Sequence, residues 1–350
     1  MSSKVNNLNI AKQYPLPTPQ EILEELPTTF VSEDTVFRFR QVVENIIQRR
    51  DPRILVITGP CSIDSLPAAL EYASALRSLQ QKVADKMFLV MRTYFEKPRT
   101  TLGWKGMIYD PDMNQSFNIE KGVRMARKLL LEITRMELPA ATEFLEPIIP
   151  QYYADLISWA AIGARTVESQ THRQLASGLS MPVGFKNATD GSINIAVEAI
   201  QTARAKHSFL GVINDGRTGV FQTRGNRNCH LILRGGQHLT NYSSEHVAYA
   251  VELMRRLKLT PSVMIDCSHS NSQRDPLAQP KILMDVVGQI RSGQRAICGV
   301  MLESYIKTGR QDISSAGKIF PGISVTDPCL GWKETEEAIL TAYEQLPQPV

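Results

Sequence analysis

The chain carries the stretch Arg53-Ile-Leu-Val-Ile-Thr-Gly-Pro-Cys-Ser62, in which an apolar run rich in branched residues ends abruptly. Short apolar runs closed by Gly and Pro are typical of buried parallel strands that stop at a turn. This turn holds Cys61 at the carboxyl end of a core strand, where ligands bind in open α/β sheets and in (β/α)8 barrels. The alternative is an ordinary buried cysteine of the core. If the same pattern recurs along the chain, a ligand-binding strand end is favoured over an ordinary core cysteine.

The pattern does recur, with helical periodicity between most of the runs. The predicted strands are Ile54–Thr58, Phe88–Tyr94, Ala140–Phe144, Ile162–Thr166, Val183–Lys186, Cys229–Arg234, Val263–Cys267 and Ile297–Leu302. The predicted helices among and after them are Pro67–Gln80, Lys121–Thr134, Gln151–Ala160, Ser192–Ala203, Ser243–Leu257, Pro280–Arg291 and Glu334–Tyr343. Alternating strands and helices indicate a parallel sheet covered by helices, and eight such units fit a closed barrel. The predicted fold class is therefore α/β, a (β/α)8 TIM barrel.

Two additions to the barrel are expected. Residues 1–50 form an N-terminal arm and two helices, the first starting at Thr18-Pro-Gln-Glu21 and the second running from Ser32 to about Arg49. A pair of strand-like runs around Asn214-Asp-Gly216 exceeds the count of eight and predicts a β-hairpin inserted at 208–224. We therefore divide the chain into a regulatory or interface segment, 1–50, and a catalytic barrel, 51–350.

Composition narrows the class of protein. The 43% hydrophobic and 21% charged residues are those of an ordinary globular protein, and a net charge of +4 gives no case for nucleic-acid binding. Neither a signal-peptide pattern nor an apolar stretch of membrane-spanning length occurs. Five scattered cysteines do not form a disulfide framework. CxxC, Walker A and GxGxxG patterns are absent, which argues against zinc ribbons, P-loop NTPases and Rossmann folds. We expect a cytoplasmic protein without a nucleic-acid or membrane partner.

Every predicted strand ends in or beside a polar residue: Cys61, Arg92, Glu143, Arg165, Lys186, Arg234, His269 and Glu303. One or two such residues would carry no weight, since loops are polar anyway, but all eight converge on one mouth of a barrel. Cations predominate, and the loop 94–113 adds Lys97, Arg99 and Lys105. Taken singly, each cation is more simply a solvated surface charge. Together they would repel one another without an anionic ligand, so we expect small, multiply charged, phosphorylated substrates.

Three of the other strand-end residues, Cys61, His269 and Glu303, form a candidate metal shell with Asp327, which follows later in Val325-Thr-Asp-Pro328. Sulfur, nitrogen and oxygen donors suit one first-row divalent ion, Mn²⁺, Fe²⁺, Co²⁺ or Zn²⁺, better than Mg²⁺ or Ca²⁺. No local spacing motif marks the four, and whether Cys61 binds the ion or only lies beside it stays open. The other histidine and cysteines of the apolar strands and their ends are expected in the core: Cys229, His230, Cys267, Cys298 and Cys329.

Eight segments, taken in order, resemble 3-deoxy-D-arabino-heptulosonate 7-phosphate (DAHP) synthases of class I, found in bacteria and fungi. The segments are Gly59-Pro-Cys-Ser62, Met91-Arg-Thr-Tyr-Phe-Glu-Lys-Pro-Arg-Thr100, Gly103-Trp-Lys-Gly106, Gly163-Ala-Arg-Thr166, Gly184-Phe-Lys-Asn187, Leu233-Arg-Gly-Gly236, Asp266-Cys-Ser-His269 and Ser324-Val-Thr-Asp327. The resemblance covers nearly the whole chain, and its Lys-Pro-Arg-Thr loop is highly specific to the family.

The resemblance implies a metal-dependent condensation of phosphoenolpyruvate with erythrose 4-phosphate, the first step of the shikimate pathway. By this likeness Cys61, His269, Glu303 and Asp327 bind the metal. Phosphoenolpyruvate would be held by Arg92, Lys97, Lys105, Arg165, Lys186 and Arg234, with backbone N–H groups near Gly163 and Ala164. Lys97, Pro98, Arg99 and Thr100 would serve erythrose 4-phosphate. Lys97, Glu143 and a metal-bound water are the candidates for proton transfer, and the sequence does not choose among them.

The same family is often feedback-inhibited by one aromatic amino acid. The matching residues are Pro150, Gln151, Leu175, Leu179, Ser180, Phe209, Gly211 and Phe221, with Asn6, Asn7 and Ile10 on the arm of a neighbouring subunit. Packing between helices and hairpin is the alternative role for most of them. In the family, glycine at position 211 goes with tyrosine and serine with phenylalanine, and Glu146-Pro147 departs from the Asp-Met of phenylalanine-type members. We predict inhibition by tyrosine.

Two other functions are compatible with a barrel of this kind. A 3-deoxy-D-manno-octulosonate 8-phosphate synthase uses arabinose 5-phosphate on a similar barrel, but it lacks the Lys-Pro-Arg-Thr loop, the N-terminal extension and the hairpin. A non-catalytic aromatic-amino-acid-binding regulator would be expected to have lost ligands, whereas all four metal candidates and all the cations are present. Arm and hairpin suggest an interface, and the family likeness implies a homodimer or a homotetramer.

Overall fold

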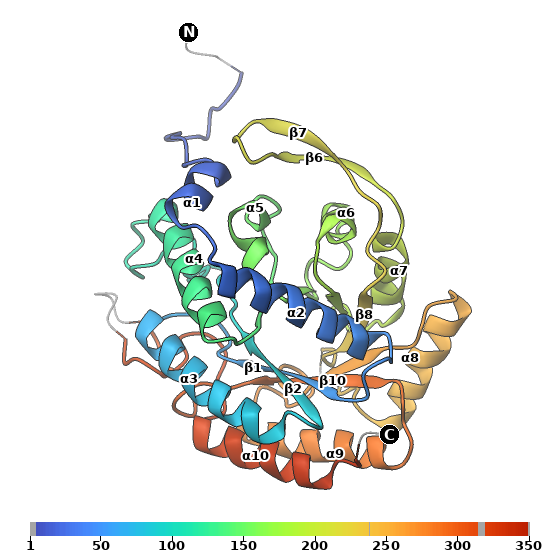
Figure 1. Cartoon of the computed structure of the whole chain (residues 1–350). Coiled ribbons are helices and arrows are strands. Elements are labelled where there is room, and N and C mark those ends of the chain that lie inside the picture. The colour runs from blue at the N-terminus through green and yellow to red at the C-terminus, as the bar shows by residue number, and fades with distance from the viewer. Residues whose placement is uncertain (1–4, 238, 314–318, 349–350) are drawn as a thin grey trace.

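Eight parallel strands close into a barrel in the computed structural model, which describes residues 5–237, 239–313 and 319–348 (Figure 1). The barrel strands are β1 (Ile54–Gly59), β2 (Met87–Arg92), β3 (Ala140–Glu143), β4 (Trp159–Ile162), β5 (Val183–Lys186), β8 (Cys229–Leu233), β9 (Val263–Asp266) and β10 (Ile297–Glu303). Each strand pairs with the next barrel strand along the chain, and β10 closes on β1. The predicted (β/α)8 barrel is confirmed.

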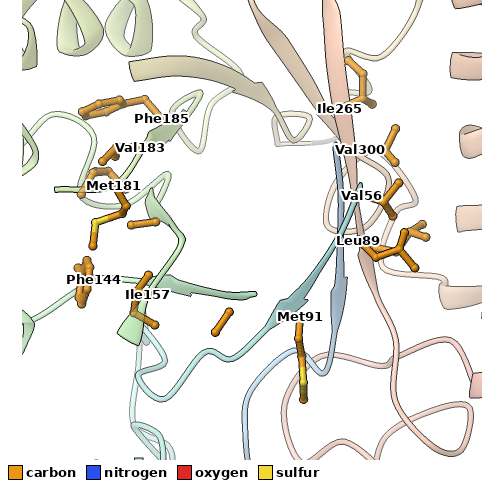
Figure 2. Packing of buried hydrophobic residues seen from close by; sticks show 14 of the residues in the cluster. Val56, Leu89, Met91, Phe144, Ile157, Met181, Val183, Phe185, Ile265 and Val300 are labelled. Carbon is orange, nitrogen blue, oxygen red and sulfur yellow. The ribbon is translucent and has the colours of Figure 1, made fainter. Parts of the chain in front are cut away.

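Helices surround the barrel and bury the outward face of its strands. They are α3 (Leu66–Val83), α4 (Ile119–Arg135), α5 (Pro150–Tyr153), α6 (Gln170–Gly178), α7 (Asn194–Ala203), α8 (Ser244–Arg256), α9 (Gln279–Arg291) and α10 (Trp332–Gln345). Outward strand residues such as Val56, Leu89 and Val300 belong to the cluster that packs between strands and helices (Figure 2). Apolar burial on this scale is the main stabilising contribution to such a fold.

Alternate strand residues face inward and form a second buried cluster, which includes Leu55, Ile57 and Val90. Helix α2 (Phe30–Ile47) adds Val43 and Ile46 to this cluster, so it covers the amino-terminal end of the barrel. Because that end is closed by apolar side chains, the polar residues of the strands lie at the opposite, carboxyl end. This is the end at which barrel enzymes bind their substrates.

The fourth barrel strand differs from its prediction. It spans Trp159–Ile162 instead of Ile162–Thr166, and the helix predicted at Gln151–Ala160 ends at Tyr153, followed by a 3-10 turn at Ala154–Leu156. Trp159 is fully buried, and its Nε1–H donates to Nε2 of His230 inside the barrel at 2.8 Å. The carbonyl of Gly163 already accepts hydrogen bonds from the next turn, so the residues after Ile162 cannot continue the strand.

The N-terminal helices and the hairpin form where they were predicted. Helix α1 (Pro19–Glu25) starts with a capping box between Thr18 and Glu21, and α2 begins at Phe30 rather than Ser32 because Thr29 caps it. Strands β6 (Ser208–Val212) and β7 (Thr218–Gln222) pair antiparallel and extend over α5 and α6 (Figure 1). The described part of the chain contains no helix long and apolar enough to cross a membrane.

His230 predicts a specific dependence of stability on pH. Burial lowers its pKa to about 3, whereas a histidine in an unfolded chain titrates near 6.5. Between these values the unfolded chain binds one more proton, so the free energy of unfolding falls as the pH falls below about 6.5, by up to about 1.4 kcal/mol per pH unit. We expect His230→Gln, which does not titrate, to lose this part of the dependence. Urea unfolding of the wild type and the variant at pH 7.0 and 5.5 measures the change in the free energy of unfolding between the two pH values.

A matched control is His207→Gln, at a half-buried position outside the barrel interior. That variant should keep the pH dependence of the wild type. Equal pH dependence in the wild type and His230→Gln would contradict the prediction.

Candidate active site

The period of two that fills the barrel with apolar side chains also brings its polar residues together. Arg92 follows the inward-facing Val90 by two residues, and Glu303 follows the inward-facing Met301 in the same way. The strand ends and the loops after them line a cavity of about 260 Å³. The predicted residues among its lining are Arg92, Lys97, Pro98, Arg99, Thr100, Glu143, Ala164, Arg165, Lys186, Arg234, His269 and Asp327.

Two predicted substrate residues do not line the cavity. Lys105 has an exposed side chain, while its carbonyl accepts the Lys97 N–H at 2.9 Å and so supports the loop that carries Lys97. Gly163 lies against Glu143, where an added Cβ would come within 2.1 Å of a carboxylate oxygen. The glycine therefore leaves room for the Glu143 side chain in the mouth of the barrel.

Three of the four candidate metal ligands converge beside the cavity. Donor atoms of Cys61, Glu303 and Asp327 lie within 4.8 Å of one another, and Cys61 Sγ is 3.6 Å from Asp327 Oδ2. His269 is outside this group of three, but its Nε2 is 3.6 Å from Glu303 Oε1. The mixed donors could hold one first-row divalent ion, the class expected from the sequence.

A buried carboxylate orients the imidazole of His269. Asp266 Oδ2 is 2.8 Å from Nδ1, and the Ser268 hydroxyl is 2.7 Å from the same atom. Burial alone would raise the pKa of Asp266, but His269 and Lys186 hold it well below the usual range. A carboxylate on Nδ1 favours the tautomer that leaves Nε2 free to bind a metal, an arrangement common among histidine ligands.

The deepest cations each have an acidic partner in the protein. Arg92 Nη2 lies 2.9 Å from Glu303 Oε1, and Lys186 Nζ lies 3.3 Å from Asp266 Oδ2. Lys97 Nζ contacts Cys61 Sγ at 2.7 Å and Asp327 Oδ2 at 2.9 Å. Removing one partner of a fully buried pair such as the first two costs about 3–5 kcal/mol, so these contacts fix the floor of the cavity.

Electrostatics keep the carboxylate donors ionised and the thiol protonated in the protein alone. Burial raises the pKa of Cys61 to about 11, with Glu303 adding to the rise and Lys97 opposing it. Burial also opposes ionisation of Glu303 and Asp327, but the cations around them hold both pKa values below the usual range. A bound metal cation lowers the pKa of a thiol, so the Cys61 proton would leave when an ion binds.

Four residues of the site with titratable side chains were missed by the sequence analysis. Tyr94 and Glu96 continue the inward alternation of β2, and Asp266 continues that of β9, so the period of two could have identified these three. The Glu96 carboxylate accepts the N–H groups of Leu145 and Glu146, and burial raises its pKa to about 8. The fourth residue, Arg274, follows His269 in an irregular loop, and no periodicity marks it.

A second cavity, of about 730 Å³, lies under the hairpin. Its lining includes all eight predicted barrel and hairpin residues of the regulatory set: Pro150, Gln151, Leu175, Leu179, Ser180, Phe209, Gly211 and Phe221. Asn6, Asn7 and Ile10 are exposed on the arm and are not among the lining residues of this single chain. Their predicted place is in the cavity of a neighbouring subunit.

Known proteins resemble this chain over nearly its full length. Residues 28–340 match the DAHP synthetase I family. A Tyr-sensitive phospho-2-dehydro-3-deoxyheptonate aldolase of Escherichia coli K12 is 48% identical over 343 residues, which cover 98% of this chain and 96% of that protein. The Phe-sensitive aldolase of the same strain is 49% identical over 336 residues, 96% of each chain. The solved structure of a phospho-2-dehydro-3-deoxyheptonate aldolase from Francisella tularensis SCHU S4 superposes with a TM-score of 0.94, at 46% identity, over 97% of this chain and 98% of that one.

The donor geometry predicts a metal–thiolate bond. Titration with Co²⁺ should produce sulfur-to-cobalt charge-transfer absorption in the wild type, because Cys61 Sγ lies among the carboxylate donors. Cys61→Ser should lose this absorption and bind Co²⁺ at least tenfold more weakly, whereas Cys229→Ala, a change in the core, should keep both properties. Unchanged absorption and affinity in Cys61→Ser would show that Cys61 is not a ligand.

Proposed function

The chain belongs to the DAHP synthetase I family, and from that premise we propose that it condenses phosphoenolpyruvate with erythrose 4-phosphate and water. The products are DAHP and phosphate, in the first step of the shikimate pathway. The observation that carries the proposal is the mouth of the barrel, where cations, several without an ion-pair partner in the described residues, surround a set of metal donors. The two substrates together bring three anionic groups, one carboxylate and two phosphates, to such a site.

The balance of charge supports substrates of this kind. Arg92, Lys97 and Lys186 have partners within the protein. In the described ranges no carboxylate comes within 4.0 Å of Arg99 or Arg165, and none comes that near to Arg234. Each donates a hydrogen bond to a neutral oxygen of the protein, but none has its charge paired within the described residues. Arginine forks bind phosphate and carboxylate oxygens in pairs, so the three charges can hold the substrates.

The chain's own residues position the reaction. Arg92, Arg165, Lys186 and Arg234 would hold phosphoenolpyruvate with its C3 directed at the aldehyde carbon, and the Lys97–Thr100 loop would hold erythrose 4-phosphate. Fixing two anions in this way turns a bimolecular reaction into a positioned one. After C3 attacks the aldehyde, water adds at C2 of the former phosphoenolpyruvate, and phosphate leaves from the hemiketal phosphate.

Proton transfer falls to groups already held in the mouth. The Lys97 ammonium is fixed by Cys61 and Asp327, so it can donate a proton to the aldehyde oxygen as that oxygen becomes an alkoxide. Glu143 is the candidate for a different proton transfer, in which a base takes a proton from the attacking water.

The donor set fits a resident Mn²⁺, Fe²⁺, Co²⁺ or Zn²⁺ ion. Cys61, Glu303 and Asp327 are close enough to share one ion, and Asp266 orients His269 toward Glu303. Such an ion acts as a Lewis acid on the aldehyde oxygen when it is bound.

The direct test follows phosphoenolpyruvate consumption by the purified chain. We expect consumption that requires erythrose 4-phosphate, stops with a metal chelator and returns with added Mn²⁺ or Co²⁺. Arabinose 5-phosphate serves as the competing sugar, because preference for it would favour the octulosonate-forming alternative. No consumption with either sugar in the presence of metal would overturn the proposal and favour the non-catalytic regulator.

We also propose that tyrosine inhibits the enzyme from the hairpin cavity. Overall identity does not choose the effector, since the Tyr-sensitive and Phe-sensitive relatives are 48% and 49% identical to this chain. The residue at position 211 supports tyrosine locally. Any Cβ at this position would lie 2.8 Å from the Phe221 ring, so a side chain there would narrow the cavity. Glycine lets the stacked rings of Phe209 and Phe221, 5.6 Å apart, leave space for a phenol hydroxyl.

The assembly we propose is a homodimer or a homotetramer in the cytoplasm. Exposed apolar residues of the hairpin, Leu210 and Val220, and of the arm, Leu8 and Ile10, support an interface there. An arm from a second subunit could then bring its Asn6 and Asn7 to the hairpin cavity.

Gly211→Ser tests the choice of effector. The added side chain must displace the Phe221 ring and narrow the cavity, so we expect tyrosine inhibition to weaken about tenfold relative to phenylalanine inhibition, about 1.4 kcal/mol. Each variant is measured as the fraction of its own uninhibited rate. Arg217→Gln, at the exposed turn of the same hairpin, is the control and should keep the wild-type preference. Selective inhibition of the wild type by phenylalanine or tryptophan, with tyrosine inert, would refute the tyrosine assignment.

A further inference from the structure

The cations of the catalytic cavity lie at two depths. Arg92 and Lys186, only 1% and 3% exposed, are on its floor. Arg99, Arg165 and Arg274 are exposed at its rim and come from three different loops, after β2, β4 and β9. When one end of an elongated ligand lies on the floor, its other end therefore lies near these three guanidinium groups.

Arg274 forms no ion pair with an acid in the described residues; its positive charge helps to lower the pKa of Asp327, but that carboxylate is paired with Lys97. In the part of the chain that the structure describes, no carboxylate oxygen comes within 4.0 Å of its guanidinium. The adjacent acid, Asp275, accepts the backbone N–H of Leu277 at 3.0 Å and caps the turn at Pro276–Ala278. The charge of Arg274 is therefore available to a ligand.

The backbone holds Arg274 in a fixed place relative to His269. His269, Gln273 and Arg274 all have left-handed φ values, 52°, 54° and 63°, which are unfavourable for residues other than glycine. The Arg274 N–H donates to the His269 carbonyl at 2.8 Å. The buried Asn271 anchors the loop, because its side-chain amide donates to carbonyls at the ends of β8 and β9, at 3.1 and 2.9 Å. Backbone strain of this kind is typical of functional loops.

Two other guanidinium groups lie close to that of Arg274. Arg234 donates to the Ser270 hydroxyl, in the same loop, at 3.1 Å. Burial lowers the pKa of Arg234; the negative charge of Asp266 opposes this, and the positive charges of Arg165 and Arg274 add to the lowering. Arg165 in turn donates to Thr100 Oγ1 at 3.3 Å, which links this group to the Lys-Pro-Arg-Thr loop. Like charges gathered at a rim are stabilised by an anion between them.

We propose that Arg274 is a specificity-determining residue that binds the phosphate of the aldose phosphate opposite Arg99. The inference rests on the proposed function, in which the aldehyde end of the sugar must reach the floor beside Cys61 and Glu303. The phosphate, at the other end of the sugar, then lies at the rim. Because Arg274 is fixed through His269, the distance from floor to rim sets the length of sugar that fits, and a four-carbon chain is preferred to a five-carbon chain.

The test compares substrates with and without the phosphate. Arg274→Gln should raise the KM for erythrose 4-phosphate about tenfold or more, with kcat and the KM for phosphoenolpyruvate changed less than twofold. With unphosphorylated erythrose, the variant and the wild type should have equal kcat/KM. The preference of the variant for erythrose 4-phosphate over arabinose 5-phosphate should fall at least fivefold. Arg274→Lys, which keeps the charge without the fork, should recover part of the loss.

Controls separate this role from a structural one. Arg256→Gln, at an exposed arginine of α8, should behave as the wild type. If Arg274 acted only through His269, Arg274→Gln would lose equal activity on erythrose and erythrose 4-phosphate and would bind Co²⁺ more weakly, and that result overturns the proposal. Unchanged KM for erythrose 4-phosphate also overturns it.

Failure of the proposed reaction would be visible in the wild type. If the wild type consumes no phosphoenolpyruvate with any aldose phosphate, the function is wrong, and calorimetric binding of erythrose 4-phosphate then decides the role of Arg274. Weaker binding to Arg274→Gln than to the wild type supports the phosphate site, and equal binding rejects it.

Discussion

Pairing of buried charges at the floor of the barrel is the constraint on which the rest of the site depends. Arg92 and Glu303 are 1% and 2% exposed in their side chains, and their ion pair joins β2 to β10. Lys186 and Asp266 likewise join β5 to β9. An unpaired charge at this depth would cost several kcal/mol, so each partner fixes the position of the other. The same two acids lie beside His269, so the charge pairs and the candidate metal ligands share one rigid framework.

This framework explains why the cavity has two tiers. Floor cations are largely neutralised by protein carboxylates, so they shape the site and their charge is mostly balanced before a ligand arrives. Rim guanidinium groups are exposed and unpaired in the described residues, so their attraction for anions is felt at the entrance. A ligand with several negative charges distributed along its length matches both tiers. A single small anion would leave some of the rim guanidinium groups without a counter-charge, and these would still repel one another.

Much of this arrangement could be predicted because it follows from the period of two in the strands. Apolar runs that end in Gly, Pro or a charged residue identified seven of the eight barrel strands, and the strand ends placed Cys61 and Glu303 together, with Asp327 added from the loop before α10. The fourth strand was misplaced because its short run of Trp, Ala and Ile is equally compatible with a helix until Trp159 meets His230 in the barrel. Arg274 could not be found in this way, because an irregular backbone, held by distant hydrogen bonds, decides where it lies.

Residues 143–150 run from the catalytic cavity to the hairpin cavity. Glu143 begins this segment in the catalytic mouth, and Pro150 ends it against the hairpin cavity. Between them, Leu145 and Glu146 donate their N–H groups to Glu96, the residue before Lys97. A ligand that displaces Pro150 must therefore stretch the bonds to Glu96 or move Glu96 with the segment. Because burial makes those hydrogen bonds costly to break, a ligand of the hairpin cavity that moved Pro150 would move the Lys97 loop more easily than it would break the bonds to Glu96.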